Sequence, residues 1–410
     1  MFLGSRPIDD PAADAGRFLC RLALIILMIV TPGAEVASRL AIYSLLPIGA
    51  AVLFIAGLVV GTGEVPRRLA RIILSPLGLA ALLLSLWAGL SLLWTPFPGE
   101  ASARFVKALS TEILVVLAIV FLPERTRPAN LYLLPIGLAL AAIATLVFSL
   151  LRPHYFNGGA GPDAALAQRC TMSMVMLVFP ALGALSLRER WRLAAALAAL
   201  VVAAALAAFV QVALAAFAVG ALVYVAAMAS PSRVAKVCGY FFAGLVVGAP
   251  ILALALTLLA NILPHAGLLA PAKVAGGIVL QQWPRLITGH GLDMTVHAID
   301  IGYLPPTTPR SLLFQLWYDL GIIGALSFAF LTAGAFLVIG RLSPTYAPPI
   351  LGGIATGLVI AICGAETTQV WWITLNGLNA IAFAIFAKAH MRRKRLTAAA
   401  FEDTAQEMQA

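Results

Sequence analysis

The sequence predicts an all-α, polytopic membrane protein with about 12 transmembrane helices, on three observations. Of the 410 residues, 62% are hydrophobic and 11% are charged, whereas a soluble domain carries roughly a quarter charged residues. Apolar runs of about 20 residues, the length that crosses a bilayer core, recur along the whole chain. The alternating pattern of a membrane β-barrel is absent. We therefore expect a single integral membrane domain over residues 1–410.

The length rule places the membrane spans in order along the chain. The weakest boundary lies near Phe209, where residues 194–229 form one apolar stretch too long for a single helix, with Gln211 as a polar interruption. We interpret this stretch as two helices joined by a tight turn. The predicted spans are 17–33, 40–61, 73–95, 103–122, 129–151, 167–187, 191–208, 211–229, 237–262, 311–339, 349–365 and 369–388.

Basic residues predict the orientation of these spans, because cytoplasmic loops are enriched in Lys and Arg. With both termini in the cytoplasm, eighteen of the 27 Lys and Arg residues fall on the inner side and eight on the outer side. The net charge of +10 is then mostly an orientation signal. We expect residues 389–410 to form a basic cytoplasmic tail, and we expect no nucleic-acid partner.

One outer connection, residues 263–310, is much longer than most of the others. A long ordered loop in a compact protein is usually functional, so we expect this outer loop to be functional. Within it, residues 271–287 have apolar residues at helical spacing, which predicts a short helix on the membrane surface.

The sequence gives little indication of a metal site or a redox centre. Cys20, Cys170, Cys238 and Cys363 form no CxxC pair. The outer acids contain no DxD pair, and His290, Asp293 and His297 do not have the spacing of a helical zinc site. A hydrogen-bonded loop is the alternative interpretation of these three residues. We expect no metal and no cofactor.

Three outer arginines lie beside apolar segments. Arg169 begins one span, Arg310 begins another, and Arg285 lies in the predicted surface helix. A guanidinium group presents a planar fork of donors that matches phosphate oxygens. Several arginines facing one outer cavity would suit a lipid diphosphate. The alternative for each is an anchor whose side chain extends to lipid headgroups.

Several segments in order along residues 167–387 carry a family resemblance. Gly289 and Gly291 of "ITGHGLDM" match a G-x-G turn. Gln315, Trp317, Asp319, Leu320, Gly321 and Gly324 match a helix of the form LQxWLELGxxGA, and Gln369, Trp371 and Trp372 match a W-Q-x-W-W segment. With these segments the chain resembles bacterial O-antigen ligases and related Wzy-type polymerases.

The resemblance implies a GT-C-like glycosyltransferase of the bacterial inner (plasma) membrane that moves a polysaccharide from undecaprenyl diphosphate to a lipid A–core acceptor at the periplasmic face. It implies that residues 263–310 are a periplasmic loop that carries part of the active site. It implies substrate contacts for Arg169, Arg285, Gln315, Asp319, Gln369 and Trp372. The family's active-site histidine aligns with Arg310. Since arginine does not accept a proton, Arg310 would act on phosphate, and His290, His297 and Asp293 are the candidates for the base.

Other functions stay open at this point. A Wzy-type polymerase, whose acceptor is another lipid-linked repeat unit, shares the same segments. A transporter or flippase fits about 12 spans equally well, although the two halves of the chain show no clear internal repeat. A non-catalytic member that binds the lipid carrier is a further alternative.

Overall fold

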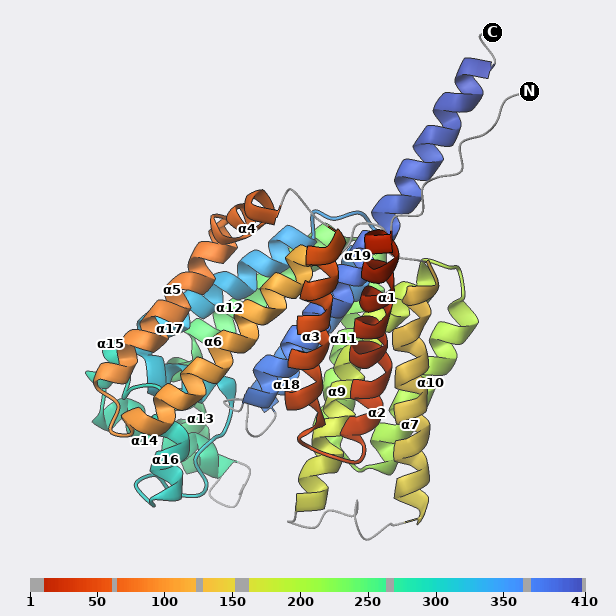
Figure 1. Ribbon diagram of the computed structural model, residues 1–410. Helices are drawn as coiled ribbons and strands as arrows, with labels where there is room; N and C mark the ends of the chain where they lie inside the picture. Colours follow the sequence, from red (N-terminus) through yellow and green to blue (C-terminus); the bar gives the residue numbers. More distant parts are fainter. Residues whose placement is uncertain are drawn as a thin grey trace. The chain divides into compact units, whose positions relative to one another are not determined.

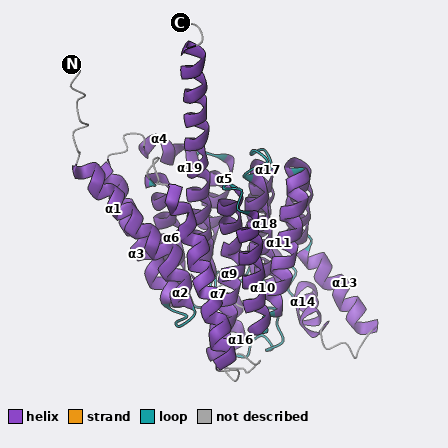
Figure 2. Ribbon diagram, turned by 90° about the vertical axis from the view of Figure 1, so that its right-hand side faces the viewer, coloured by secondary structure: helices purple, strands orange, loops and turns teal. Residues whose placement is uncertain are grey.

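The computed structural model describes residues 11–60, 65–122, 128–151, 162–262, 269–363 and 370–407. Over these residues the chain forms helices and no strands, as predicted (Figure 2). Eight described helices are long and apolar enough to cross a membrane, or nine if one bent pair counts as one span. The chain is thus a membrane-embedded helical protein, and the larger count of about 12 spans stays a prediction.

The predicted break in the apolar stretch 194–229 is confirmed. Helix α10 (Trp191–Ala207) ends two residues before Phe209, which has a positive φ of 54°. Helix α11 (Gln211–Ala229) then begins at Gln211. A left-handed residue between two helices ends the first helix and reverses the chain in a tight turn.

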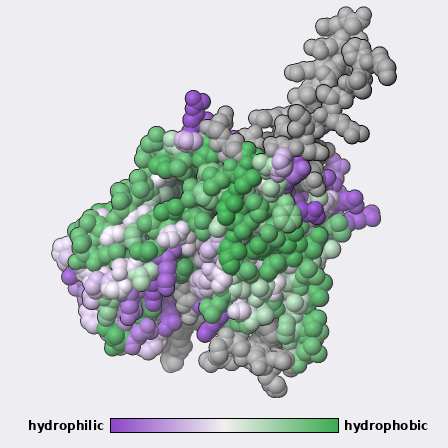
Figure 3. Space-filling view, in the orientation of Figure 1, coloured by the Kyte–Doolittle hydropathy of each residue, from purple (hydrophilic) through white to green (hydrophobic). Residues whose placement is uncertain are grey.

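Large apolar side chains point outward from the described helices. Leu93, Leu150 and Ile251 are 80%, 79% and 74% exposed, and hydrophobic residues cover much of the face in Figure 3. Contiguous apolar surface of this kind is rare on soluble monomers. In a bilayer the same side chains contact acyl chains without penalty.

The chain packs as two compact units. Unit 1 comprises Met1–Leu69, Glu112–Val210 and Leu375–Ala410, and unit 2 comprises Ala70–Thr111 and Gln211–Thr374. The helices α4 (Val65–Ile73), α6 (Pro98–Phe121) and α19 (Val370–Glu407) contribute residues to both units.

Unit 1 is a helical bundle around α9 (Pro162–Ser186), whose residues Met172–Ala181 are all buried. The π-helical turn η1 (Ile26–Val30) connects α1 to α2 within the first apolar segment. In Figure 1, α7 (Leu133–Leu151) and α10 run beside α9. The unit also contains α1 (Pro11–Ile25), α2 (Thr31–Glu35), α3 (Ala41–Val60) and η3 (Pro128–Tyr132).

Unit 2 packs α17 (Leu312–Ile339) against α5 (Pro76–Leu90) and α12 (Pro231–Val247). Helix α18 (Ala347–Cys363) packs on α11. The segment between α13 (Ala249–Ile262) and α17 contains three short helices, α14 (Ala270–Gln281), α15 (Arg285–Thr288) and α16 (Met294–Asp300). The short turn η2 (Ser91–Leu93) ends α5.

Two predicted helices differ from the structure. The predicted span 237–262 is not one straight helix, since α12 and α13 meet at Gly248 with a bend of 70°. Proline at position 250 and glycine at position 248 both disfavour an uninterrupted helix. The helix predicted over 271–287 ends at Gln281, because Pro284 starts the separate turn α15. Helix α14 packs on α13, where Thr257 Oγ1 donates a hydrogen bond to Ala272 O (2.8 Å).

The predicted orientation can be measured with an introduced cysteine. Ile301 is 61% exposed at the end of α16, so Ile301→Cys in a Cys363→Ser background should react with a membrane-impermeant thiol reagent in intact spheroplasts. Arg190→Cys, in a predicted inner connection, is the matched control and should react after lysis alone. The reverse labelling pattern would contradict the orientation.

Candidate functional site

The G-x-G turn docks onto a break in α17. Gly321 has a φ of +65° inside this helix, which leaves the preceding carbonyl groups without their intrahelical donors. The amide of His290 donates to Tyr318 O (2.8 Å), and the amide of Gly291 donates to Asp319 O (3.0 Å). The loop backbone thereby replaces the missing donors of the broken helix.

The fit between this loop and α17 leaves no room for side chains at Gly289 and Gly321, and Gly291 packs equally tightly on Thr95. A Cβ atom on Gly289 would lie 2.2 Å from Asp319 O, and one on Gly321 would lie 2.5 Å from Ile287 O. Gly289 and Gly291 also have φ values of +74° and +103°, which favour glycine. Trp87 Nε1 donates to Leu320 O (2.8 Å) and satisfies the third carbonyl group.

Asp319 anchors α16 rather than lying open to a ligand. Its carboxylate is buried at 3% exposure. Oδ1 accepts hydrogen bonds from Thr295 N (2.9 Å) and Thr295 Oγ1 (2.6 Å). A carboxylate that accepts from the first amides of a helix stabilises that helix start. Asp319 therefore positions α16, which carries His297.

A cluster of four charged or titratable side chains joins α6 to the start of α16. Glu100 and Arg104 lie one turn apart on α6, and Asp293 and His297 lie one turn apart at α16. Arg104 Nη1 forms an ion pair with Asp293 Oδ1, and His297 Nε2 forms one with Glu100 Oε2. His297 Nδ1 bonds to Asp293 O (3.0 Å), while the Phe97 ring stacks on the imidazole at 4.6 Å.

The protonation of His297 follows from its partners. Both ring nitrogens face oxygen acceptors, and an imidazole that donates twice is the charged form. Burial lowers the pKa of His297, but the hydrogen bonds and charges of Asp293 and Glu100 outweigh it and raise the pKa. The hydrogen bond and charge of His297 lower the pKa of Glu100. Burial raises the pKa of Asp293 against the opposing charges of Arg104 and His297.

The side chains of this cluster differ in their solvent exposure. The Asp293 and His297 side chains are 4% and 10% exposed, whereas the Glu100 side chain is 69% exposed. A reacting molecule can therefore reach the Glu100 carboxylate, while the buried pair fixes its position. Of the predicted base candidates, His297 and Asp293 lie in one cluster, and His290 does not belong to it.

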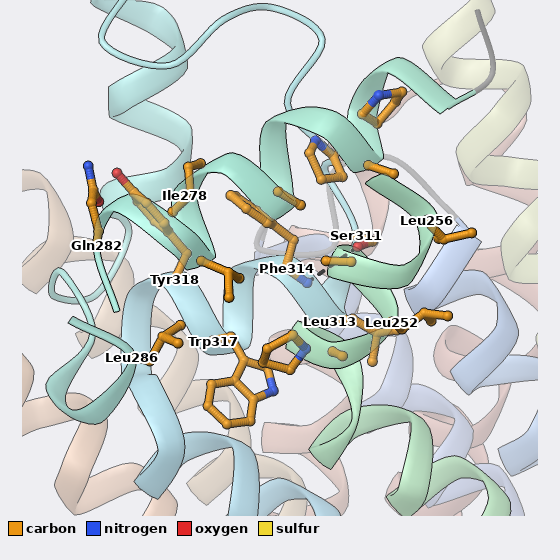
Figure 4. Close-up of a pocket in the computed structure, with 18 of the residues that line it drawn as sticks. Leu252, Leu256, Ile278, Gln282, Leu286, Ser311, Leu313, Phe314, Trp317 and Tyr318 are labelled. Atoms are coloured by element: carbon orange, nitrogen blue, oxygen red, sulfur yellow. Dashed lines mark hydrogen bonds between the residues drawn. The ribbon is translucent and has the colours of Figure 1, made fainter. Parts of the chain in front are cut away.

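An apolar cavity of about 330 Å³ lies among α13, α14 and α17 in unit 2. Its walls include Leu252, Leu256, Ile278, Phe314 and Trp317 (Figure 4). Gln282, Arg285 and His290 line it with polar groups, and Pro309 and Ser311 line it on either side of Arg310. Ligand cavities are mostly apolar with a few polar groups that fix orientation.

His290 is held firmly at this cavity. Its Nδ1 lies 3.0 Å from Tyr318 O, its Nε2 lies 2.7 Å from the side-chain amide of Gln282, and its ring stacks on Tyr318 at 4.0 Å. Burial lowers the pKa of His290, the bond to Tyr318 O opposes this, and the charge of Arg285 adds to it. Tyr318 O and Gln282 Oε1 thus fix the orientation of the His290 ring beside the Arg285 guanidinium.

Arg285 lines the cavity, and Arg310 lies between the lining residues Pro309 and Ser311. Arg285 and Arg310 are exposed, and within the described part of the chain neither guanidinium forms a hydrogen bond or an ion pair. Surface arginines often pair with neighbouring acids. Arg285 is therefore available to an anion in the cavity, and Arg310 is an exposed cation next in sequence to two lining residues.

The other predicted substrate residues lie elsewhere or outside the described residues. Gln315 is buried on α17 at 3% exposure. Trp372 is half-buried on α19, next to Trp371 with ring centroids 6.4 Å apart. Arg169 belongs to α9 of unit 1. Gln369 lies outside the described residues.

Sequence reasoning missed Glu100 and Arg104 as site residues. Their spacing of four residues at the start of an apolar helix was the available signal, but the partners lie 189 and 197 residues away along the chain. The described residues contain no group of three or more His, Cys, Asp or Glu side chains that could hold a metal ion. The chain has no significant match among protein-family models, curated proteins or solved structures.

Proposed function

We propose that the protein is a membrane glycosyltransferase resembling O-antigen ligases. It would transfer a glycan from undecaprenyl diphosphate to a lipid A–core acceptor at the periplasmic face of the bacterial inner membrane, with both termini in the cytoplasm. The observation that carries this proposal is the apolar cavity that Arg285 lines, with Arg310 between two further lining residues, Pro309 and Ser311. This combination suits a lipid with an anionic headgroup, because the walls accept isoprenoid carbons and the two guanidinium groups donate hydrogen bonds to phosphate oxygens.

The proposed reaction is a single inverting displacement. The acceptor hydroxyl oxygen forms a bond to the anomeric carbon, and the bond from that carbon to the diphosphate oxygen breaks. The hydroxyl proton passes to the exposed Glu100 carboxylate, which His297 positions. Negative charge grows on the departing diphosphate, where Arg285 and Arg310 stabilise it.

The proton-accepting cluster and the cavity share a structural support. Tyr318 stacks on His290 at the cavity and packs with Met294 and Ala298 of α16. The adjacent Asp319 holds Thr295 of the same helix. The two halves of the proposed site are thus attached to the same turn of α17.

The direct test is transfer by the purified full-length protein in lipid nanodiscs, with an undecaprenyl-diphosphate glycan as donor and lipid A–core as acceptor. We expect product formation that survives EDTA. Product on a second lipid-linked repeat unit in place of lipid A–core would indicate the Wzy-type polymerase. Absence of transfer to either acceptor, with intact donor binding, would favour a lipid transporter or a non-catalytic binder.

Removing one arginine tests the anion site. Arg285→Ala should reduce transfer by about 10- to 100-fold, because a charge-assisted hydrogen bond contributes about 1.5–3 kcal/mol. Lys273→Ala is the matched control, since Lys273 is an exposed cation on α14 that does not line the cavity. Equal effects of both substitutions would show that general positive charge, and not the cavity edge, matters.

A further inference from the structure

A buried carboxyl group lies inside unit 1, apart from the site described above. Glu35 is the last residue of α2 and is 4% exposed. Among the described residues neither Oε1 nor Oε2 has a hydrogen-bond partner. Ionisable groups inside a membrane bundle are costly and usually mark a functional site, and an unsatisfied buried polar group calls for a specific explanation.

Ser173 is a second buried side chain without a hydrogen-bond partner among the described residues. The Ser173 hydroxyl on α9 faces the Glu35 carboxyl group, and Ser173 Oγ is itself buried without a partner in the described part of the chain. The Thr145 hydroxyl on α7 already donates a hydrogen bond to Ala141 O (2.9 Å). Thr31 likewise donates to Ile26 O (2.9 Å).

No described cation donates a hydrogen bond to Glu35. Helix α2 packs on η1, α3, α7 and α9. The segments η1 and α7 contain no titratable side chain, α3 contains Tyr43, and the described side chains of α9 include Arg169 and Cys170. Neither oxygen of Glu35 accepts a hydrogen bond from Arg169. An ionised carboxylate here would be buried and unpaired.

We propose that Glu35 is a buried proton-binding site at the end of the first apolar segment. The protonated carboxyl group is neutral, fits the apolar interior, and can donate a hydrogen bond to the free Oγ of Ser173. The proton has a short route, because residues 37–40, which follow α2, are exposed. Release of the proton would leave a buried charge and favour a different packing of α2 against α7 and α9.

The local backbone is suited to such a change. The π-helical turn η1 lies directly before α2, and π-turns inside helices occur frequently at functional sites. Helix α7 packs closely on this turn, since a Cβ on Gly137 would lie 2.0 Å from Met28 O. A shift of α2 would therefore be transmitted to α7.

Infrared difference spectroscopy on the full-length protein in nanodiscs tests the proposal without needing reagent access. At neutral pH, Glu35→Gln should lose a carbonyl-stretch band of a protonated carboxyl group relative to the wild type. Asp14→Asn is the matched control, because Asp14 is exposed and pairs with Arg17 (2.6 Å); it should lose a carboxylate band instead. Unfolding temperatures of both variants should match the wild type.

Three results would overturn the proposal. Glu35→Gln could lose an ionised-carboxylate band, which would mean that Glu35 carries a charge. The same substitution could strongly lower the unfolding temperature, as expected if a carboxylate pairs with a cation. Sodium chloride, but not choline chloride, could convert the protonated band to a carboxylate band, which would identify a sodium site.

Discussion

Glu100→Gln is expected to reduce glycan transfer by about 10²–10⁴-fold, the usual contribution of a positioned general base. The amide keeps the shape of the side chain and can still contact His297, but it cannot accept the proton of the acceptor hydroxyl. His297→Ala should give a loss of similar direction, because the exposed carboxylate would lose its fixed position. The measurement is the initial rate at saturating donor and acceptor.

The pH profile distinguishes this role from a structural one. The raised pKa of His297 means that the ion pair with Glu100 is present at neutral pH and is lost as the pH rises through the folded-state pKa of His297. The lowered pKa of Glu100 means that its carboxylate is lost as the pH falls through that value. We therefore expect a bell-shaped rate profile, and His297→Ala should remove its alkaline limb.

Lys107→Ala is the matched control for these substitutions, since Lys107 is an exposed residue on the same helix as Glu100. Its transfer rate and pH profile should stay unchanged. An unchanged rate for Glu100→Gln would contradict the proposed role and leave His290 as the remaining base candidate.

Gly321→Ala is expected to destabilise unit 2 severely, by about 2–6 kcal/mol from left-handed backbone strain and overpacking together. The new Cβ would lie 2.5 Å from Ile287 O and 2.7 Å from Gly289 N. Both neighbours are backbone atoms of the docked loop, so neither can move as a flexible side chain would. Thermal unfolding in nanodiscs should show the loss.

Substitutions at two other glycines separate the effect of backbone strain from the effect of close packing. Gly302 has a φ of +75°, and a Cβ atom there would meet no other atom within 4 Å, so Gly302→Ala reports backbone strain alone. Gly277 lies in α14 with open space around it, so Gly277→Ala should be neutral or slightly stabilising. If Gly321→Ala cost no more than Gly302→Ala, close packing of the loop on α17 would not be a major source of stability.

The sequence predicted the helical architecture well because apolar runs of membrane length depend on local composition. Even the turn near Phe209 was found, since Gln211 interrupts an otherwise apolar stretch. The bend at Gly248 was missed, because the residues on both sides are apolar and hydropathy does not report direction. Pro250, directly after the break, was the signal that could have placed it.

The candidate site was predicted only in part, because the sequence shows which residues are close along the chain but not which helices are neighbours in space. Residues close in sequence, such as His290, Asp293 and His297, stand out as a group. The pairing of Asp293 with Arg104 and of His297 with Glu100 depends on which helices are neighbours in space. We expected Asp319 to contact substrate, whereas in the structure its partner is Thr295. This pairing depends on the break in α17 at Gly321. The helical pattern of the sequence gives no sign of that break.

The docking of the G-x-G turn onto α17 also has an entropic consequence. Two backbone amides and three closely packed glycines fix this loop through contacts within the protein. The conformational entropy of residues 289–291 is therefore lost when the chain folds, and not when a ligand arrives. A ligand that contacts His290 meets a preorganised surface, and more of its interaction free energy remains for affinity and orientation.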